Sequence, residues 1–213
     1  MSNRLAGMLA ALLPIAALSV SAAEPRASAG IASPDARIAV EITTDGEGRA
    51  SYAVSRDGHA VIAPSRLGFL LGDGRLERNL EFVGQSTRSV DETWEQPWGE
   101  RRQTRNHYNE LRASFAERGD GRRFDVVFRV YDDGVGFRYE FPEQAALTTV
   151  RIGTELTQFN LAENGEALWC PAWEWNREEH LYRRTSIDAV GSAQTPMTVR
   201  GDSGLHVSIH EAA

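Results

Sequence analysis

The run LRASFAERGDGRRFDVVFRVYDDGVGFRYEF, from Leu111 to Phe141, holds three short apolar segments separated by two glycine-containing turns. Alternating apolar residues mark the middle segment: Phe124, Val126, Phe128 and Val130. This is the period of a strand with one buried face. Short alternating segments joined by Asp-Gly pairs are typical of β hairpins. We therefore expect antiparallel strands over Leu111–Glu117, Phe124–Tyr131 and Val135–Phe141.

The same signal recurs on both sides of this run. Further strands are expected over Arg37–Thr43, Ala50–Val54, His59–Ile62, Val150–Leu156 and Leu205–His210. No stretch of about ten residues repeats apolar positions at the spacing of an amphipathic helix. Many short strands about ten residues apart are typical of a sandwich or barrel of antiparallel sheets. The predicted fold is all-β, in one domain.

The composition is that of an ordinary soluble globular protein and argues against nucleic-acid binding. Of the 213 residues, 41% are hydrophobic and 25% are charged, and the formal net charge is −7. All 23 basic residues are Arg and they form no basic block, whereas nucleic-acid phosphates demand clustered positive charge. The single cysteine, Cys170, excludes an internal disulfide and a cysteine-cluster zinc site.

The beginning of the chain differs in character from the rest. Arg4 precedes the apolar run from Leu9 to Val20, and small residues follow. These features are typical of a secretory signal peptide, and the apolar core is shorter than a membrane-spanning helix. We therefore expect residues 1–23 to be a signal peptide, 24–33 a linker and 34–213 the folded domain. No later segment is apolar enough to span a bilayer, and a lone cysteine fits export to a bacterial periplasm.

The stretch from Trp94 to Glu110 is the first candidate for ligand binding. It places Trp94 and Trp98 on either side of a proline and continues into a cluster of Asn, His and Tyr. Exposed indole faces beside polar groups suit a sugar, whose C–H faces stack while its hydroxyls bond outward. Alternatively, the rings plug the end of a sandwich, and Asn106 and Asn109 bond turn backbone.

The stretch from Leu168 to Tyr182 is the second candidate. Three of the five Trp lie within it, beside three carboxylates and a histidine: Trp169, Trp173, Trp175, Glu174, Glu178, Glu179 and His180. Such a loop suits a carbohydrate pocket, or it supplies oxygens to a hard cation such as calcium. The alternative is a solvated acidic loop with buried Trp anchors. A calcium ion is coordinated by about 6–8 oxygen atoms, so these carboxylates alone do not form a calcium site.

Several segments, taken in order, carry a resemblance to a known family. They are Ser33–Asp35, Pro64–Gly68, Glu92–Trp94, Pro97–Glu100, Arg105–Leu111, Asp133–Phe141, Gln158–Phe159, Trp169 with Pro171, Gln194–Pro196 and His210–Ala213. Trp-Gly-Glu followed by Arg-Asn-His-Tyr-Asn-Glu-Leu is a specific combination. Over nearly the whole chain after residue 23, the sequence resembles the amino-terminal domain of glycoside hydrolase family 97.

The resemblance implies a fold for this domain and the kind of enzyme to which it belongs. Members of the family are exported bacterial enzymes that act on α-glucosides or α-galactosides. Their amino-terminal domain is a β-supersandwich of antiparallel sheets, similar to the aldose mutarotase fold. A catalytic (β/α)8 barrel and a small β domain follow it. The implied partners are therefore an α-linked oligosaccharide and the enzyme's own barrel domain, with no nucleic acid and no membrane.

The resemblance also implies a calcium ion in the active site, held mainly by barrel glutamates. The amino-terminal domain contributes one glutamate, located three residues before a Tyr. Glu179, followed by Tyr182, has that spacing, whereas a gap-free alignment from Trp169 selects Glu178. We prefer Glu179, with Glu178 as the alternative, and expect Trp173 and Trp175 to contact carbohydrate.

The sequence ends at Ala213, so no catalytic residue of the family can be assigned in this chain. We expect the chain to be the amino-terminal domain of a longer hydrolase that caps the active site, and to hydrolyse no glycoside by itself. Two other hypotheses remain. One is a stand-alone carbohydrate-binding sandwich that uses the Trp94–Trp98 or Trp173–Trp175 rings. The other is a structural module that only supports a neighbour.

Overall fold

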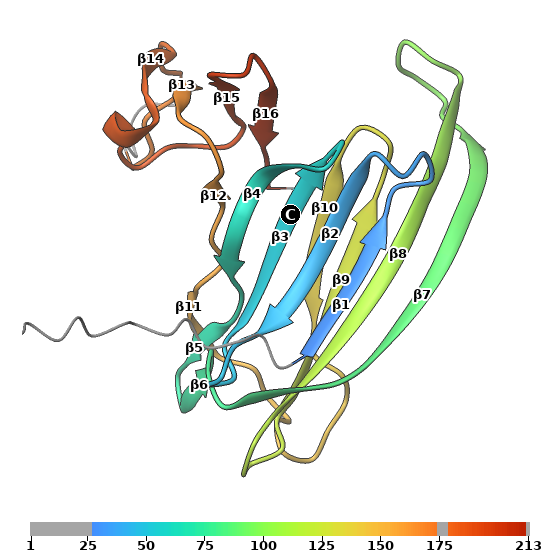
Figure 1. The fold of residues 1–213 in the computed structure, drawn as a ribbon, viewed down its shortest axis with the longest axis vertical. Coiled ribbons are helices and arrows are strands. Elements are labelled where there is room, and N and C mark those ends of the chain that lie inside the picture. Colours follow the sequence, from blue (N-terminus) through green and yellow to red (C-terminus); the bar gives the residue numbers. More distant parts are fainter. Residues whose placement is uncertain (1–26, 174–178, 212–213) are drawn as a thin grey trace, which may run out of the picture.

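A computed structural model of the chain describes residues 27–173 and 179–211 (Figure 1). The regular structure in these ranges is antiparallel β strand, apart from the 3-10 turn η1 (Ile187–Ala189). The predicted all-β sandwich is therefore confirmed. Among the same residues, no helix is long and apolar enough to cross a membrane.

Two large sheets face each other and form the sandwich (Figure 1). The first, in the order β1-β2-β3-β4-β12, consists of β1 (Ala27–Ala32), β2 (Ile38–Thr44), β3 (Ala50–Arg56), β4 (His59–Arg66) and β12 (Asn160–Leu161). The second, in the order β10-β9-β8-β7, consists of β7 (Leu80–Glu95), β8 (Gln103–Glu117), β9 (Arg123–Val130) and β10 (Val135–Glu140). Strands β8, β9 and β10 are the three predicted from the run between Leu111 and Phe141.

The core of the sandwich consists of the inward faces of these sheets. The predicted alternation in β9 is confirmed, since its four inward residues are fully buried: Phe124, Val126, Phe128 and Val130. Aromatic contacts join the layers. The ring centroids of Tyr52 on β3 and Phe128 on β9 are 5.7 Å apart. Within the second sheet, Phe115 on β8 stacks on its cross-strand partner Phe124 on β9, with ring centroids 5.4 Å apart. Buried aromatic pairs of this kind add to the free energy gained by burying their area.

Residues 24–33, predicted to be a linker, instead contain β1. This strand pairs with β2 along its full length, from Ala27 opposite Thr44 to Ala32 opposite Ala39. The prediction was wrong because a segment of small residues lacks the alternation that marks a strand. In β1, the hydrogen bonds to β2 determine the strand conformation, not the pattern of side chains.

The hairpin of β7 and β8 is longer than the sequence pattern indicated. Strand β8 begins at Gln103, and its first part pairs only with β7, because pairing with β9 starts at Asn109. Asn106 and Asn109 therefore lie in a strand, not in a turn. The Asn109 side-chain amide donates to the Ala32 carbonyl of β1 at 2.9 Å and so joins the two large sheets.

Two smaller sheets complete the fold. One, in the order β11-β5-β6, consists of β5 (Phe69–Leu71), β6 (Gly74–Leu76) and β11 (Ile152–Glu155). The other, in the order β14-β13-β15-β16, consists of β13 (Gly165–Trp169), β14 (Arg183–Ser186), β15 (Met197–Gly201) and β16 (His206–Ile209). This last sheet lies apart from the large sheets in Figure 1. It has its own small core around Ala167, Trp169 and Val199.

Candidate functional site

The segment 170–182 connects β13 to β14 and carries the residues predicted to bind calcium and carbohydrate. Trp169 anchors its start. The indole is buried, its N–H donates to Thr185 Oγ1 at 3.0 Å, and the Arg183 guanidinium lies 5.4 Å from the ring centroid. Because Arg183 and Thr185 belong to β14, the residues that precede and follow the segment are held together.

A second attachment lies just beyond Trp169. The Ala172 N–H donates to the Ser192 carbonyl at 2.9 Å, and the Gln194 N–H donates to the Cys170 carbonyl at 2.8 Å. The Gln194 side-chain amide donates to the Pro171 carbonyl at 2.9 Å. The Cys170 thiol lies 3.8 Å from the His180 carbonyl, which accepts its weak hydrogen bond. The segment therefore leaves the sheet from a fixed base.

Beyond this base, four of the described residues are exposed to solvent, whereas His180 is partly buried. Trp173 is 88% exposed and has a left-handed backbone, with φ at 71°. Glu179 is exposed, as are Leu181 and Tyr182. Large apolar side chains left exposed in this way are candidates for contact with another molecule.

Two of the predicted site residues, Trp175 and Glu178, lie outside the described residues. Trp173 and Glu179 are each exposed, but their predicted roles, and the choice between Glu178 and Glu179, are not tested by the structure.

An isolated calcium site is absent from the described part of the chain. No group of three or more His, Cys, Asp or Glu side chains lies close enough there to hold a metal ion. Calcium binds several oxygen ligands at once. Any calcium ion bound by the exposed Glu179 carboxylate would therefore need oxygens in addition to the carboxylates of the described residues.

The other tryptophan stretch forms the tip of the hairpin of β7 and β8, which projects at the upper right in Figure 1. Trp98 is 82% exposed and Trp94 is 49% exposed, so these rings do not plug the end of the sandwich. The tip is closed by Gln96, whose backbone N–H donates to the Arg102 carbonyl and whose side-chain amide donates to the Arg101 carbonyl. The polar groups beside the rings are thus bonded within the hairpin.

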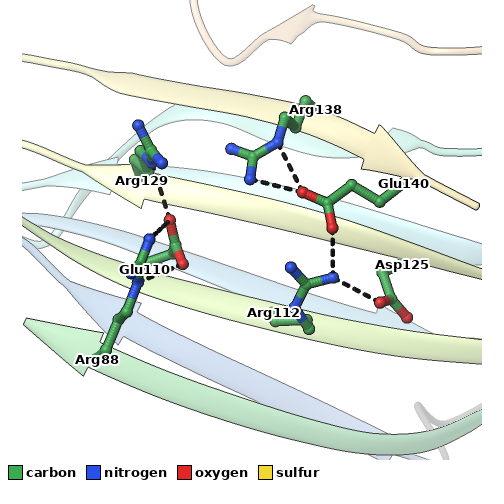
Figure 2. A network of polar contacts seen from close by, with 7 residues as sticks. All are labelled: Arg88, Glu110, Arg112, Asp125, Arg129, Arg138 and Glu140. Atoms are coloured by element: carbon green, nitrogen blue, oxygen red, sulfur yellow. Dashed lines mark hydrogen bonds and ion pairs between the residues drawn. The ribbon is translucent and has the colours of Figure 1, made fainter. Parts of the chain in front are cut away.

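A network of ion pairs covers the outer face of the sheet of β7 to β10 (Figure 2). Glu110 accepts from Arg88 with both oxygens, at 2.7 and 3.0 Å, and from Arg129 at 2.8 Å. Arg112 contacts Asp125 and Glu140, each at 2.6 Å. The sequence analysis missed this network, although charged residues alternate along β8, β9 and β10.

The electrostatics of this network exclude it as an acid catalyst. Hydrogen bonds from Arg88, assisted by Arg129, lower the pKa of the Glu110 carboxyl to about 2. A glycosidase needs a carboxylic acid that remains protonated until it donates to the leaving oxygen. The three hydrogen bonds from Arg88 and Arg129 hold Glu110 as a carboxylate and join β7, β8 and β9, an environment that does not favour proton donation.

Comparison with protein families gives a match over most of the chain. The family model described as "Glycosyl-hydrolase 97 N-terminal" matches residues 31–213. A curated relative, the "Probable retaining alpha-galactosidase" of Streptomyces bingchenggensis (strain BCW-1), is 35% identical over 146 residues. These are 68% of this chain but only 21% of that protein, so the chain spans about a fifth of the relative's length.

Comparison with solved structures also finds similarity to a member of this family. A Glycoside Hydrolase Family 97 enzyme from Pseudoalteromonas sp. strain K8, solved with panose and with acarbose, is 36% identical to this chain with a TM-score of 0.82. The match covers 87% of this chain and 28% of that enzyme. A β-arabinopyranosidase, at 24% identity and a TM-score of 0.74, shares the fold over 84% of this chain and 31% of its own.

Proposed function

Because this chain belongs to glycoside hydrolase family 97, as its amino-terminal domain, we propose that it is the non-catalytic domain of a hydrolase acting on α-glucosides or α-galactosides. The names of the relatives support this substrate class, since one is a probable α-galactosidase and another was solved with panose and acarbose. The chain spans 28% of the solved enzyme. In this proposal, catalysis belongs to another domain of the enzyme.

The domain caps the active site with the segment 170–182. The observation that carries this proposal is the exposed carboxylate of Glu179, on a segment whose base is fixed while Trp173 points to solvent. Glu179 supplies one oxygen ligand to a calcium ion shared with the catalytic domain, and Trp173 offers a ring face to a sugar. The chemistry that calcium supplies in such a site is a fixed positive charge against substrate oxygens.

Calcium titration of the full-length enzyme tests this role. Glu179→Gln keeps the size of the side chain and removes its charge, so the calcium Kd should rise by about tenfold or more. Glu178→Gln tests the alternative ligand. Glu143→Gln, at an exposed carboxylate in another part of the chain, is the matched control. If neither Glu178 nor Glu179 affects the calcium Kd, the proposed shared ligand is wrong.

Export to the periplasm belongs to the same proposal. It is supported by the character of residues 1–23, which lie outside the described part of the chain. The intact mass of the protein recovered from a bacterial periplasmic fraction should correspond to a chain that begins at Glu24. Recovery of the uncleaved chain in the cytoplasm alone would contradict export.

A second candidate function is a stand-alone carbohydrate-binding domain. The observation that favours it is the exposure of Trp98 and Trp173, at 82% and 88%. Titration of the chain with maltose, followed by tryptophan fluorescence, tests it. Saturable quenching of the fluorescence would support binding. If Trp98→Ala or Trp173→Ala abolishes the quenching, the substituted ring contacts the sugar. A flat signal at millimolar sugar counts against this function.

A further inference from the structure

Asn164 and Gly165, at the start of β13, form the one Asn-Gly step in the sequence. Asparagine is among the chemically labile residues of proteins. Its side-chain amide carbon lies within reach of the main-chain nitrogen of the next residue, which attacks it once deprotonated and closes a ring. A side chain on the next residue hinders this attack, and glycine has none. The step is therefore a candidate for chemical modification, provided that the fold leaves both groups available.

The fold requires glycine at this position. A Cβ on Gly165 would overlap the Arg200 carbonyl oxygen and would lie 2.8 Å from the Gly201 Cα. Both are main-chain atoms of β15, which cannot rotate away as the end of a long side chain can. A bulkier residue that would shield Asn164 from attack is therefore incompatible with the packing of β13 on β15.

The Gly165 N–H is not engaged in the sheet. Opposite residues of an antiparallel ladder alternate between pairs that exchange hydrogen bonds and pairs that do not. Gly165 lies opposite Gly201, whose N–H donates instead to the Leu205 carbonyl at 2.8 Å, so this pair exchanges none. On the other side, β14 ends at Ser186, opposite Glu166. Within residues 27–173 and 179–211, the Gly165 N–H therefore has no hydrogen-bond acceptor.

The Asn164 side chain is available as well. It is exposed, and it makes no hydrogen bond within the described part of the chain. Three other asparagines, by contrast, donate from their side-chain amides to oxygens of the fold: Asn106, Asn109 and Asn160. Among the described asparagines, Asn164 thus combines an unbonded side chain with an unbonded N–H on the following residue.

We propose that Asn164 is a site of spontaneous deamidation. The Gly165 nitrogen loses its proton to solvent and attacks Asn164 Cγ, forming a C–N bond. The bond from Cγ to Nδ2 breaks, and this nitrogen takes up a proton and leaves as ammonia. Water then opens the ring. Attack of water at Cγ gives aspartate, and attack at the former main-chain carbonyl carbon gives isoaspartate. The inference does not depend on the proposed function of the domain.

The isoaspartate product should loosen the turn between β15 and β16. The Asn164 carbonyl accepts from the Asp202 N–H at 2.9 Å. The Glu163 carboxylate accepts from the Ser203 N–H and hydroxyl at 2.9 and 2.7 Å. Isoaspartate adds one atom to the main chain and converts this carbonyl into a carboxylate, close to Glu163. The geometry that holds the Asp202 N–H is then lost.

The first test is peptide mass spectrometry of the folded 213-residue chain after incubation in mildly alkaline buffer. The matched control is Asn79, which is also exposed with an unbonded side chain, but the following Leu80 N–H donates to the Gly48 carbonyl at 3.0 Å. The peptide with Asn164 should gain the mass difference between hydroxyl and amino groups at least about tenfold faster, because one net hydrogen bond alone supplies about that factor. Equal rates at the two positions would overturn the proposal.

The unfolded chain tests whether the fold leaves the step reactive. In concentrated urea, deamidation at Asn164 should proceed within about tenfold of the rate in the folded chain, since no more than one net hydrogen bond separates the two states. A folded chain that reacts far more slowly would overturn the proposal, because the strand would then protect the step. Asn164→Gln places the amide one carbon farther away, and this position should gain no mass.

The second test measures amide exchange at Asp202 in the separated isoaspartate product. Exchange there should be about two- to tenfold faster than in the unmodified chain, the range for one net hydrogen bond. Asn164→Asp adds the same charge without the extra main-chain atom, and its exchange at Asp202 should stay near that of the unmodified chain. Exchange in β9 should not change in either. Unchanged exchange at Asp202 in the isoaspartate product would overturn the effect on the turn.

Discussion

Arg88 and Glu110 lie opposite each other on β7 and β8 and form a two-point ion pair, with Nε to Oε1 at 2.7 Å and Nη2 to Oε2 at 3.0 Å. The Glu110 side chain is only 8% exposed, although Arg88 is largely solvated. Arg129 approaches the same carboxylate and stacks over Tyr108, 4.7 Å from the ring centroid. The charge of Glu110 is therefore compensated twice.

Replacing Glu110 should destabilise the fold in a pH-dependent way. Its folded-state pKa of about 2 lies below its ordinary value of 4.5, so its ionisation favours folding above pH 4.5. That contribution is lost as the pH falls from 4.5 toward 2. We expect Glu110→Gln to lower the free energy of unfolding by about 2 kcal/mol at pH 7, and less at pH 3, in urea titrations.

The control for Glu110 is an exposed pair. Glu95 contacts Arg102 at 2.7 Å, with both side chains more than half exposed, and Glu95→Gln should cost less than about 0.5 kcal/mol. Equal effects of the two substitutions, or an effect of Glu110→Gln that is constant between pH 3 and pH 7, would contradict the assigned role.

Gly48 and Gly58 offer a matched pair of turn glycines. Both have left-handed backbones, with φ at 71° and 80°. A Cβ on Gly48 would lie 2.5 Å from the Leu80 carbonyl oxygen, whereas a Cβ on Gly58 would meet nothing within 4 Å. We expect Gly58→Ala to lower the free energy of unfolding by about 1 kcal/mol, from backbone strain alone. Gly48→Ala should lower it by about 3 kcal/mol, because the steric contact adds to the strain. Thermal and urea unfolding measure both. If both substitutions lower the free energy of unfolding equally, the backbone near Leu80 must move to accommodate the added methyl group at little cost.

Asn109→Ala should loosen β1. The substitution removes the hydrogen bond from the Asn109 amide to the Ala32 carbonyl, which lies in the edge strand. We expect a loss of about 1 kcal/mol and faster amide exchange in β1 than in β9. Asn160→Ala removes a similar bond, to the Pro64 carbonyl at 2.8 Å, and is the control. If it accelerates exchange in β1 equally, Asn109 has no specific role there.

The purified chain should hydrolyse neither nitrophenyl α-glucoside nor nitrophenyl α-galactoside. The sequence offers no catalytic residue that the family resemblance would assign, and the most perturbed described carboxyl, Glu110, is ionised and fully hydrogen-bonded. Release of nitrophenol is followed over hours against a blank. Turnover that increases with the concentration of the chain and survives repeated chromatography would disprove the expectation.

The sequence predicted the hairpins whose side chains alternate, and it failed where pairing partners determine the strand. Phe124 to Val130 alternates, and β9 lies where expected. Strand β1 consists of small residues, and the early part of β8, from Gln103, is polar on both faces. Neither has a pattern that distinguishes it from a loop, because its strand conformation comes from backbone pairing with the adjacent strand of its hairpin and not from alternating apolar side chains.

The sequence named Trp173 and Glu179 as candidate site residues, and both are exposed, but their roles stay predictions. The attachment by Gln194 was not foreseen, because it joins residues more than twenty positions apart through a single amide. Individual side-chain hydrogen bonds of this kind leave no periodic signal in a sequence.

The sheet of β13 to β16 has a core of its own, with three buried residues, Ala167, Trp169 and Val199, whereas the core between the main sheets is much larger. Melting temperature therefore reports chiefly on the sandwich and is a poor guide to the state of the segment that β13 and β14 hold. A substitution at Val199 that disturbs this small core can therefore escape a screen that measures melting temperature alone. Assays of variants in this sheet need a local probe, such as amide exchange in β13 and β15.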